Sequence, residues 1–416
     1  MCAHKQLFLS RAYTPFLVEM NHMFYILLSI ALICFSLFIV IYVLYFLLVI
    51  RTSKKKEYLK LIENAFKKDL SLQQLPNVSI LVPTYNEEKV ISRKLQNIAA
   101  LDYPREKIEV ILVDDCSTDK TLEVAQRIFN ELNLPGKIIK NGKRGGVNAS
   151  YNRGVAESKG NLILMTDADV TIDHDALIKG VKIFKYLKNL GGITGKMVPV
   201  SSDVTAAVLI ENSYRSFFDS MLMAESAIYS TFPGYTCFTL LKKSAFSPLP
   251  LQYGSSDGNV SLATIRKGLK FLYIPGILFK EPISLKVTEQ RRQKIRRAAR
   301  LIQSTLANKD MLFKDNYGSF GKIIFPLRFA MMIISPILFF IGFTAMLLGT
   351  IYLSMTFALL LVFLFSFCTF LGAKINVHKL NVLSSFVVHQ FYLLMGLFFS
   401  QKRVATWSPA ERSRLE

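Results

Sequence analysis

The sequence predicts an α/β domain inserted between membrane-spanning segments. From Pro76 to about Lys280, short runs rich in β-branched residues alternate with amphipathic stretches. This pattern is typical of a mixed, mostly parallel sheet flanked by helices. Long uncharged stretches lie on both sides of this region, and a hydrophobic share of 51% over 416 residues is high for a soluble enzyme.

Seven strands are expected in the α/β region, which we place at residues 76–284. Ligands of such sheets bind where the strands end, so polar residues after each strand are candidate site residues. The expected strands are 78–82, 108–113, 137–140, 161–166, 192–198, 235–241 and 271–274.

The apolar stretches predict a membrane anchor and a membrane hairpin. Residues 23–50 contain no charged side chain, and a helix needs only about 20 apolar residues to cross a bilayer. Residues 323–373 are long enough for two spans. Residues 380–400 are uncharged but contain His389 and Gln390, so they form either a third span or an interfacial segment.

Positive charge flanks these stretches and sets the expected orientation. The chain has 51 Lys and Arg against 30 Asp and Glu, and the excess gathers at 51–56, 291–300 and 402–403. Such charge marks the cytoplasmic side, so we expect the α/β domain on the cytoplasmic face of the plasma membrane. Charge beside lipid explains the basicity without nucleic acid, and the five cysteines show no paired zinc spacing.

The remaining segments complete the expected organisation. Residues 51–75 read as an amphipathic linker and 285–322 as a basic interfacial helical region. Residues 1–22 and 401–416 are expected to be tails.

The sharpest chemical signal is an apolar strand that runs into Asp167 and Asp169. Residues i and i+2 of a strand point the same way, roughly 6–7 Å apart. Both carboxylates could therefore face one divalent cation, and oxygen ligands suit Mg²⁺ or Mn²⁺. The alternative is that one aspartate caps the following turn.

Other polar groups follow neighbouring strands. Tyr85 and Glu87 come after the first strand and Asp115 after the second, and residues 141–148 place glycines and Lys143 before a helix. Backbone amides and a cation in that position suit a phosphate. Each motif alone could also be a turn or a helix cap.

Taken in order, PTYNEE, VDDCSTD, GKRGGVN and TDADV resemble the first four motifs of the family 2 glycosyltransferases, which have the GT-A fold. The resemblance implies that Asp169 binds Mg²⁺ or Mn²⁺ and that Asp167 lies against the ribose or sugar. The residues that it implies for the nucleoside are Tyr85, Glu87, Asp115 and Lys143.

The family also carries a glycine-containing acceptor loop and then a Glu-Asp pair whose Asp is the general base. Here the loop corresponds to Gly234, Tyr235, Thr236 and Cys237, and the pair to Ser256 and Asp257. The resemblance therefore implies that Asp257 is the base, although Ser256 departs from the pattern. The alternative for Asp257 is a helix N-cap.

Gln293 and Arg296 resemble the Gln-x-x-Arg-Trp motif of membrane polysaccharide synthases and ceramide glucosyltransferases, in which Gln and Arg approach the diphosphate. Arg297 replaces the Trp, so the acceptor role of that position does not carry over. The alternative is a cationic interfacial helix.

The resemblance implies an inverting transfer from a nucleotide-diphosphate sugar, with a UDP-sugar as the expected donor, to a glycan or lipid acceptor at the bilayer. Processive synthesis of a hyaluronan-, chitin- or poly-N-acetylglucosamine-like chain is favoured by Gln293 and Arg296, although an export channel would need subunits to associate. The alternatives are a single transfer to a polyprenyl phosphate or glycolipid and an inactive membrane scaffold.

Overall fold

The computed structural model describes residues 2–200, 206–282, 287–355, 357–360, 362–363 and 378–401. Its centre is an eight-stranded sheet with the order β3-β2-β1-β4-β7-β6-β8-β5. The strands are β1 (Val78–Thr84), β2 (Ile108–Asp114), β3 (Gly136–Lys140), β4 (Leu162–Met165), β5 (Thr171–Ile172), β6 (Leu190–Val200), β7 (Thr239–Lys242) and β8 (Lys270–Pro282).

The sheet is mixed, as the sequence predicts. Strands β3, β2, β1 and β4 are parallel, and β6 is parallel to β8. Strand β7 joins the two parts because it is antiparallel to both β4 and β6. The two-residue β5, antiparallel to β8, is too short to show an alternating pattern in the sequence.

The expected strand at 235–241 is shorter in the structure. Residues Thr236–Phe238 form a 3₁₀ turn, and the strand begins at Thr239. The backbone amide of Thr236 donates to the carboxylate of Asp257 at 2.6 Å instead of to a neighbouring strand. A side chain distant in the sequence thus competes with sheet pairing.

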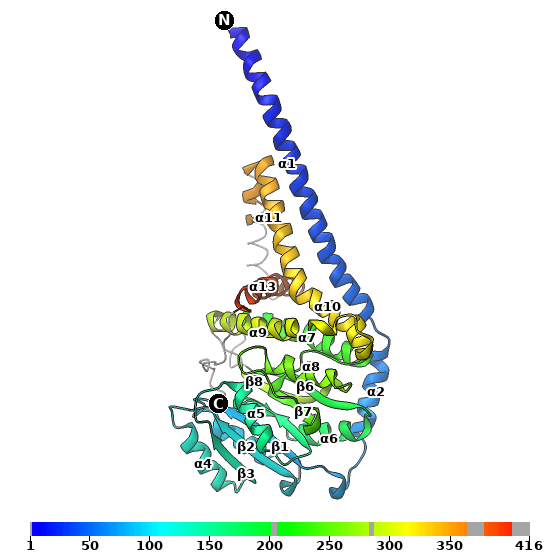
Figure 1. The fold of residues 1–416 in the computed structure, drawn as a ribbon, viewed down its shortest axis with the longest axis vertical. Coiled ribbons are helices and arrows are strands. Elements are labelled where there is room, and N and C mark those ends of the chain that lie inside the picture. Colours follow the sequence, from blue (N-terminus) through cyan, green and yellow to red (C-terminus); the bar gives the residue numbers. More distant parts are fainter. Residues whose placement is uncertain are drawn as a thin grey trace.

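Helices cover both faces of the sheet and form two cores (Figure 1). Alternate residues of β1 point to opposite faces, so Ile80 joins one core and Leu81 the other. The first core contains α2 (Lys54–Phe66), α3 (Ile91–Ala99), α4 (Thr121–Glu131), α6 (Ala176–Tyr186) and part of α7 (Ala206–Ile228). The second contains α5 (Val147–Glu157) and α8 (Ser256–Arg266).

Two long apolar helices leave this domain side by side (Figure 1). They are α1 (Cys2–Tyr45), which also includes the expected N-terminal tail, and α11 (Ser335–Leu353), which follows α10 (Phe325–Phe329). Two stretches, His22–Ile50 and Phe320–Leu353, are long and apolar enough to cross a membrane. Most of the second half of the expected hairpin, and the tail from 402 onwards, lie outside the described residues.

Helix α13 (His378–Phe399) runs across the direction of α1 and α11 and lies over the basic helix α9 (Val287–Ala307) (Figure 1). Its Gln390 side chain donates to the Tyr42 hydroxyl at 2.8 Å and accepts from Ser335 at 3.1 Å. This orientation favours the interfacial alternative for residues 380–400.

A buried ion pair joins the α/β domain to these helices. Glu225 of α7 is fully buried and accepts from Arg328 Nε of α10 at 2.6 Å. The hydroxyls of Tyr45 and Thr231 also donate to its carboxylate, at 2.5 and 2.6 Å. Three segments far apart in the sequence therefore meet at one carboxylate.

We expect Arg328→Met to destabilise the protein strongly, because it leaves the Glu225 carboxylate buried without its cation. Removing one partner of a buried pair costs about 3–5 kcal/mol. Thermal unfolding in detergent measures the effect. Arg127→Met is the matched control, because the Arg127–Glu131 pair is exposed and such pairs contribute about 0–1 kcal/mol. Equal melting temperatures for the two variants would contradict the prediction.

Candidate active site

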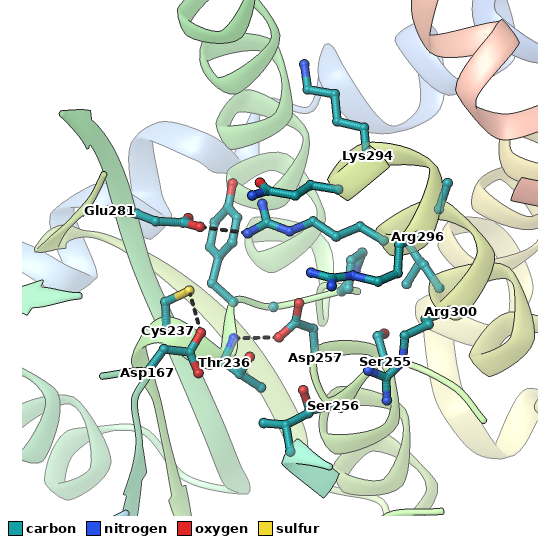
Figure 2. A pocket seen from close by; sticks show the side chains of 18 of the residues that line it. Asp167, Thr236, Cys237, Ser255, Ser256, Asp257, Glu281, Lys294, Arg296 and Arg300 are labelled. Carbon is teal, nitrogen blue, oxygen red and sulfur yellow. Dashed lines mark hydrogen bonds and ion pairs between the residues drawn. The ribbon is translucent and has the colours of Figure 1, made fainter. Parts of the chain in front are cut away.

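A cavity of about 320 Å³ lies where β1 and β4 end, and α9 and α13 close its other side. Glu87, Asp167 and Asp169 line it from the sheet, and Asp257 lines it from α8. Figure 2 shows Asp257 with Thr236 to its left and Arg296 of α9 above it. The proposed metal-binding and proton-accepting carboxylates therefore share one cavity.

Asp167 and Asp169 follow β4 directly, as expected, but they lie in a turn. The strand geometry expected for residues i and i+2 therefore does not apply to them. Strand β4 ends at Met165, whose partner Thr239 is the first residue of β7. Since β7 begins there, the chain beyond Met165 has no antiparallel neighbour to continue the ladder. The turn nevertheless directs both carboxylates into the same cavity.

Neutral groups hold the Asp167 carboxylate. The Tyr151 hydroxyl donates to one oxygen at 3.0 Å, and the Cys237 thiol donates to the other at 3.3 Å. Burial raises the pKa of Asp167 to about 6, and the nearby charges of Asp169 and Asp257 add to this rise. Because its negative charge is destabilised in this way, the carboxylate favours the binding of a cation.

These two aspartates fit a divalent metal ion. No group of three or more His, Cys, Asp or Glu side chains forms a metal cluster within the described residues. A Mg²⁺ site built from one or two carboxylates and substrate phosphates needs no such cluster. The negative charge that raises the pKa of Asp167 favours a cation there.

Asp257 does not cap α8. The N-cap is Ser255, whose hydroxyl accepts from the Gly258 amide at 3.0 Å. Asp257 lies in the first helical turn and accepts from the Thr236 amide at 2.6 Å. Burial raises the pKa of Asp257, while the bonds to Thr236 and the charge of Arg297 act in the opposite direction.

The residues expected for the acceptor loop and the basic motif also line the cavity. They are Gly234, Tyr235, Thr236, Cys237, Gln293 and Arg296. Arg297, which stands where the Gln-x-x-Arg-Trp motif has Trp, pairs with Glu281 at 2.6 Å. The charge of Glu281 raises the pKa of the Arg297 guanidinium.

The other residues expected at the nucleoside, Tyr85, Asp115 and Lys143, are not among the residues that line the cavity. The Tyr85 ring is covered by the Arg144 guanidinium, 3.6 Å from the ring centroid. Asp115 accepts from the amides of Gly145 and Gly146 at 2.9 and 2.7 Å. These bonds hold the glycine loop against the end of β2. Lys143, in the same loop, is exposed.

Sequence reasoning missed Glu281, Arg300 and Lys94. Glu281 and Arg300 line the cavity. Arg300 Nε donates to the Gly254 carbonyl at 3.0 Å, and its own carbonyl accepts from Ser255 at 3.1 Å, so α9 holds the loop before Asp257. Buried Lys94 supports the turn of Asp167 from behind. No motif marked these residues.

We expect binding of a Mn²⁺–nucleotide diphosphate to weaken as the pH falls below about 6. The pKa of Asp167 is raised to about 6, so below that pH the carboxyl is protonated and its negative charge no longer attracts the cation in the cavity. Calorimetric titration on both sides of pH 6 measures the change. Asp167→Asn should weaken binding and remove this pH dependence, and a wild-type affinity that stays constant across the range would refute the assignment.

Residues 79–248 match the family model described as Glycosyl transferase family 2. The dolichyl N-acetyl-alpha-D-glucosaminyl phosphate 3-beta-D-2,3-diacetamido-2,3-dideoxy-beta-D-glucuronosyltransferase of Methanococcus voltae is 28% identical over 287 residues, which cover 66% of this chain and 86% of that protein. The poly-beta-1,6-N-acetyl-D-glucosamine synthase of Staphylococcus aureus (strain COL) is 28% identical over 179 residues, but these cover only 43% of this chain and 42% of the synthase.

A solved structure resembles most of this chain. The mannosyltransferase PcManGT from Pyrobaculum calidifontis, in complex with GDP-Man and Mn²⁺, superposes with a TM-score of 0.68 and 20% sequence identity. The match covers 90% of this chain and 99% of that chain. At this identity, the likeness concerns the fold.

Proposed function

Because the chain carries a family 2 glycosyltransferase domain with the GT-A fold, we propose that it transfers a sugar, with inversion, from a nucleotide-diphosphate sugar to a membrane-associated acceptor. The single observation that supports this mechanism is the common cavity of Asp167, Asp169 and Asp257. A UDP-sugar remains the proposed donor. The cytoplasm is the proposed side of the reaction, since sugar nucleotides are made there.

On the donor side, Asp169 would hold Mg²⁺ or Mn²⁺, with Asp167 against the ribose or sugar. A bound divalent ion supplies Lewis-acid stabilisation of the charge on a departing diphosphate. Gln293 and Arg296 line the same cavity from α9, which supports the proposal that they bind the diphosphate oxygens. Tyr85, Glu87, Asp115 and Lys143, with Arg144 over the Tyr85 ring, are proposed to surround the nucleoside.

On the acceptor side, Asp257 would take the proton of the acceptor hydroxyl while its oxygen attacks the anomeric carbon. The bond from that carbon to the diphosphate oxygen breaks, and the nucleoside diphosphate leaves with the electron pair. Attack and departure on opposite faces invert the configuration. The raised pKa of Asp257 makes it a stronger base than an ordinary carboxylate.

Helix α13 favours a lipid-linked acceptor. Its residues His389, Tyr392 and Leu393 line the cavity. The helix lies beside the lower part of α11 (Figure 1), and its Gln390 bonds to Tyr42 of α1. A head group at the membrane surface could thus reach Asp257 while its lipid stays in the bilayer. The relative from M. voltae is named for a dolichyl-linked substrate, which adds support for a single transfer to a lipid acceptor.

Processive synthesis is the second candidate. It is supported by the placement of Gln293 and Arg296 in the cavity and by the similarity to the poly-N-acetylglucosamine synthase. Both candidates use the same donor chemistry, so they differ in the size of the product.

Membranes that contain the protein, incubated with a panel of labelled UDP- and GDP-sugars, should yield a labelled lipid that carries one added sugar. Product sizing after extraction with organic solvent provides the measurement. A polymer ladder would support the processive candidate instead. Failure of every donor to be transferred or hydrolysed would favour an inactive scaffold.

We expect Asp257→Asn to reduce transfer by about 10² or more, the usual scale for loss of a general base. Nucleotide affinity should stay close to that of the wild type, because the amide preserves the shape of the carboxylate. Asp310→Asn is the control, since Asp310 pairs with Arg266 outside the cavity. If Asp257→Asn retained wild-type turnover, the base would have to be a different group.

A further inference from the structure

The turn that carries Asp167 and Asp169 is supported from behind by α3. Lys94 of α3 is 1% exposed, and its ammonium donates to Thr166 Oγ1 at 2.7 Å and to the Val170 carbonyl at 2.9 Å. These two residues stand immediately before and after the segment of the two aspartates. Lys94 therefore ties both ends of the turn together.

A second side chain of α3 continues this support. Asn97 donates to the Ile172 carbonyl at 2.7 Å and accepts from the Ile172 amide at 2.8 Å. The short strand β5 is thereby joined to α3 as well as to β8. Hydrogen bonds from these two side chains hold the segment from Thr166 to Ile172.

Holding a turn with a buried lysine costs free energy, because the ammonium must be desolvated. Burial lowers the pKa of Lys94 to about 7, and the charges of Asp167 and Asp169 oppose this effect. A neutral side chain such as Asn97 makes comparable hydrogen bonds without the cost of desolvating a charge. Because Lys94 bonds to the residues on either side of Asp167 and Asp169, its position indicates that it holds these two carboxylates in place.

We propose that Lys94 is a positioning residue of the donor site, which holds the turn so that Asp167 and Asp169 are presented together to the metal-bound diphosphate. This inference rests on the proposed function. Lys94 does not line the cavity, so it acts through the turn and not on the substrate. Without the brace, metal binding would have to order the turn at the expense of affinity.

The test compares Lys94→Met, Thr166→Val and the double variant in the full-length protein. Binding of Mn²⁺ in the presence of UDP or GDP is followed by electron paramagnetic resonance, together with thermal unfolding. We expect each single variant to raise the Mn²⁺ dissociation constant roughly tenfold, the scale of one hydrogen bond to a charged group. Because Lys94→Met already removes the bond to Thr166 along with the bond to the Val170 carbonyl, the double variant should resemble Lys94→Met.

Lys89→Met is the matched control, because Lys89 is exposed just before α3 and should bind Mn²⁺ like the wild type. Thr166→Val provides the test if Lys94→Met does not fold. Normal Mn²⁺ affinity in the folded fraction of Lys94→Met and Thr166→Val, with only a lower melting temperature, would overturn the positioning role. Failure of the wild type itself to bind Mn²⁺ and nucleotide would overturn the proposed function along with it.

Discussion

Concentrated negative charge is the constraint on which the rest of the site depends. Asp167, Asp169, Asp257 and Glu281 all line one cavity of about 320 Å³, where burial strengthens their mutual repulsion. Neutral donors hold the first and third of these carboxylates, through Tyr151, Cys237 and the Thr236 amide. Cations hold the periphery, with Arg297 on Glu281. The cavity is also lined by the cations Arg215, Lys294, Arg296, Arg297 and Arg300. A lining that carries both charges suits the proposed binding of a divalent cation together with a diphosphate.

The antiparallel strand β7 brings the two halves of this chemistry together. It pairs directly with β4, so the segment before β7 passes beside the turn after β4. Cys237 reaches Asp167, and the neighbouring Thr236 amide reaches Asp257. One inserted strand thus connects the donor carboxylate to the proposed base through two successive residues.

The sequence predicted the sheet well, because short β-branched runs that end in polar residues are typical of strands in an α/β domain; Asp167 and Asp169 were found in this way. It could not predict residues whose role comes from tertiary contacts. Lys94 lies on an amphipathic helix, where a lysine indicates a solvent-facing side, yet it is buried. Glu281 lies near the end of the long strand β8 with no motif around it. The capping alternative for Asp257 was wrong because its neighbour Ser255 supplies the cap.

The basic helix α9 could have both of the roles that the sequence left open. Cations on such a helix could bind anionic lipid or could reach the diphosphate. The spacing of the residues along α9 is compatible with both roles. Gln293, Arg296, Arg297 and Arg300 follow the spacing i, i+3, i+4 and i+7, which places them on one helical face, and all four line the cavity. Arg291 and Arg292 fall outside this set and are exposed. Helix α13 lies over α9 and lines the cavity as well, and its Gln390 also bonds to Tyr42 of α1 and Ser335 of α11. If the proposed lipid-linked acceptor is the right one, α13 would bring its head group close to the proposed base Asp257.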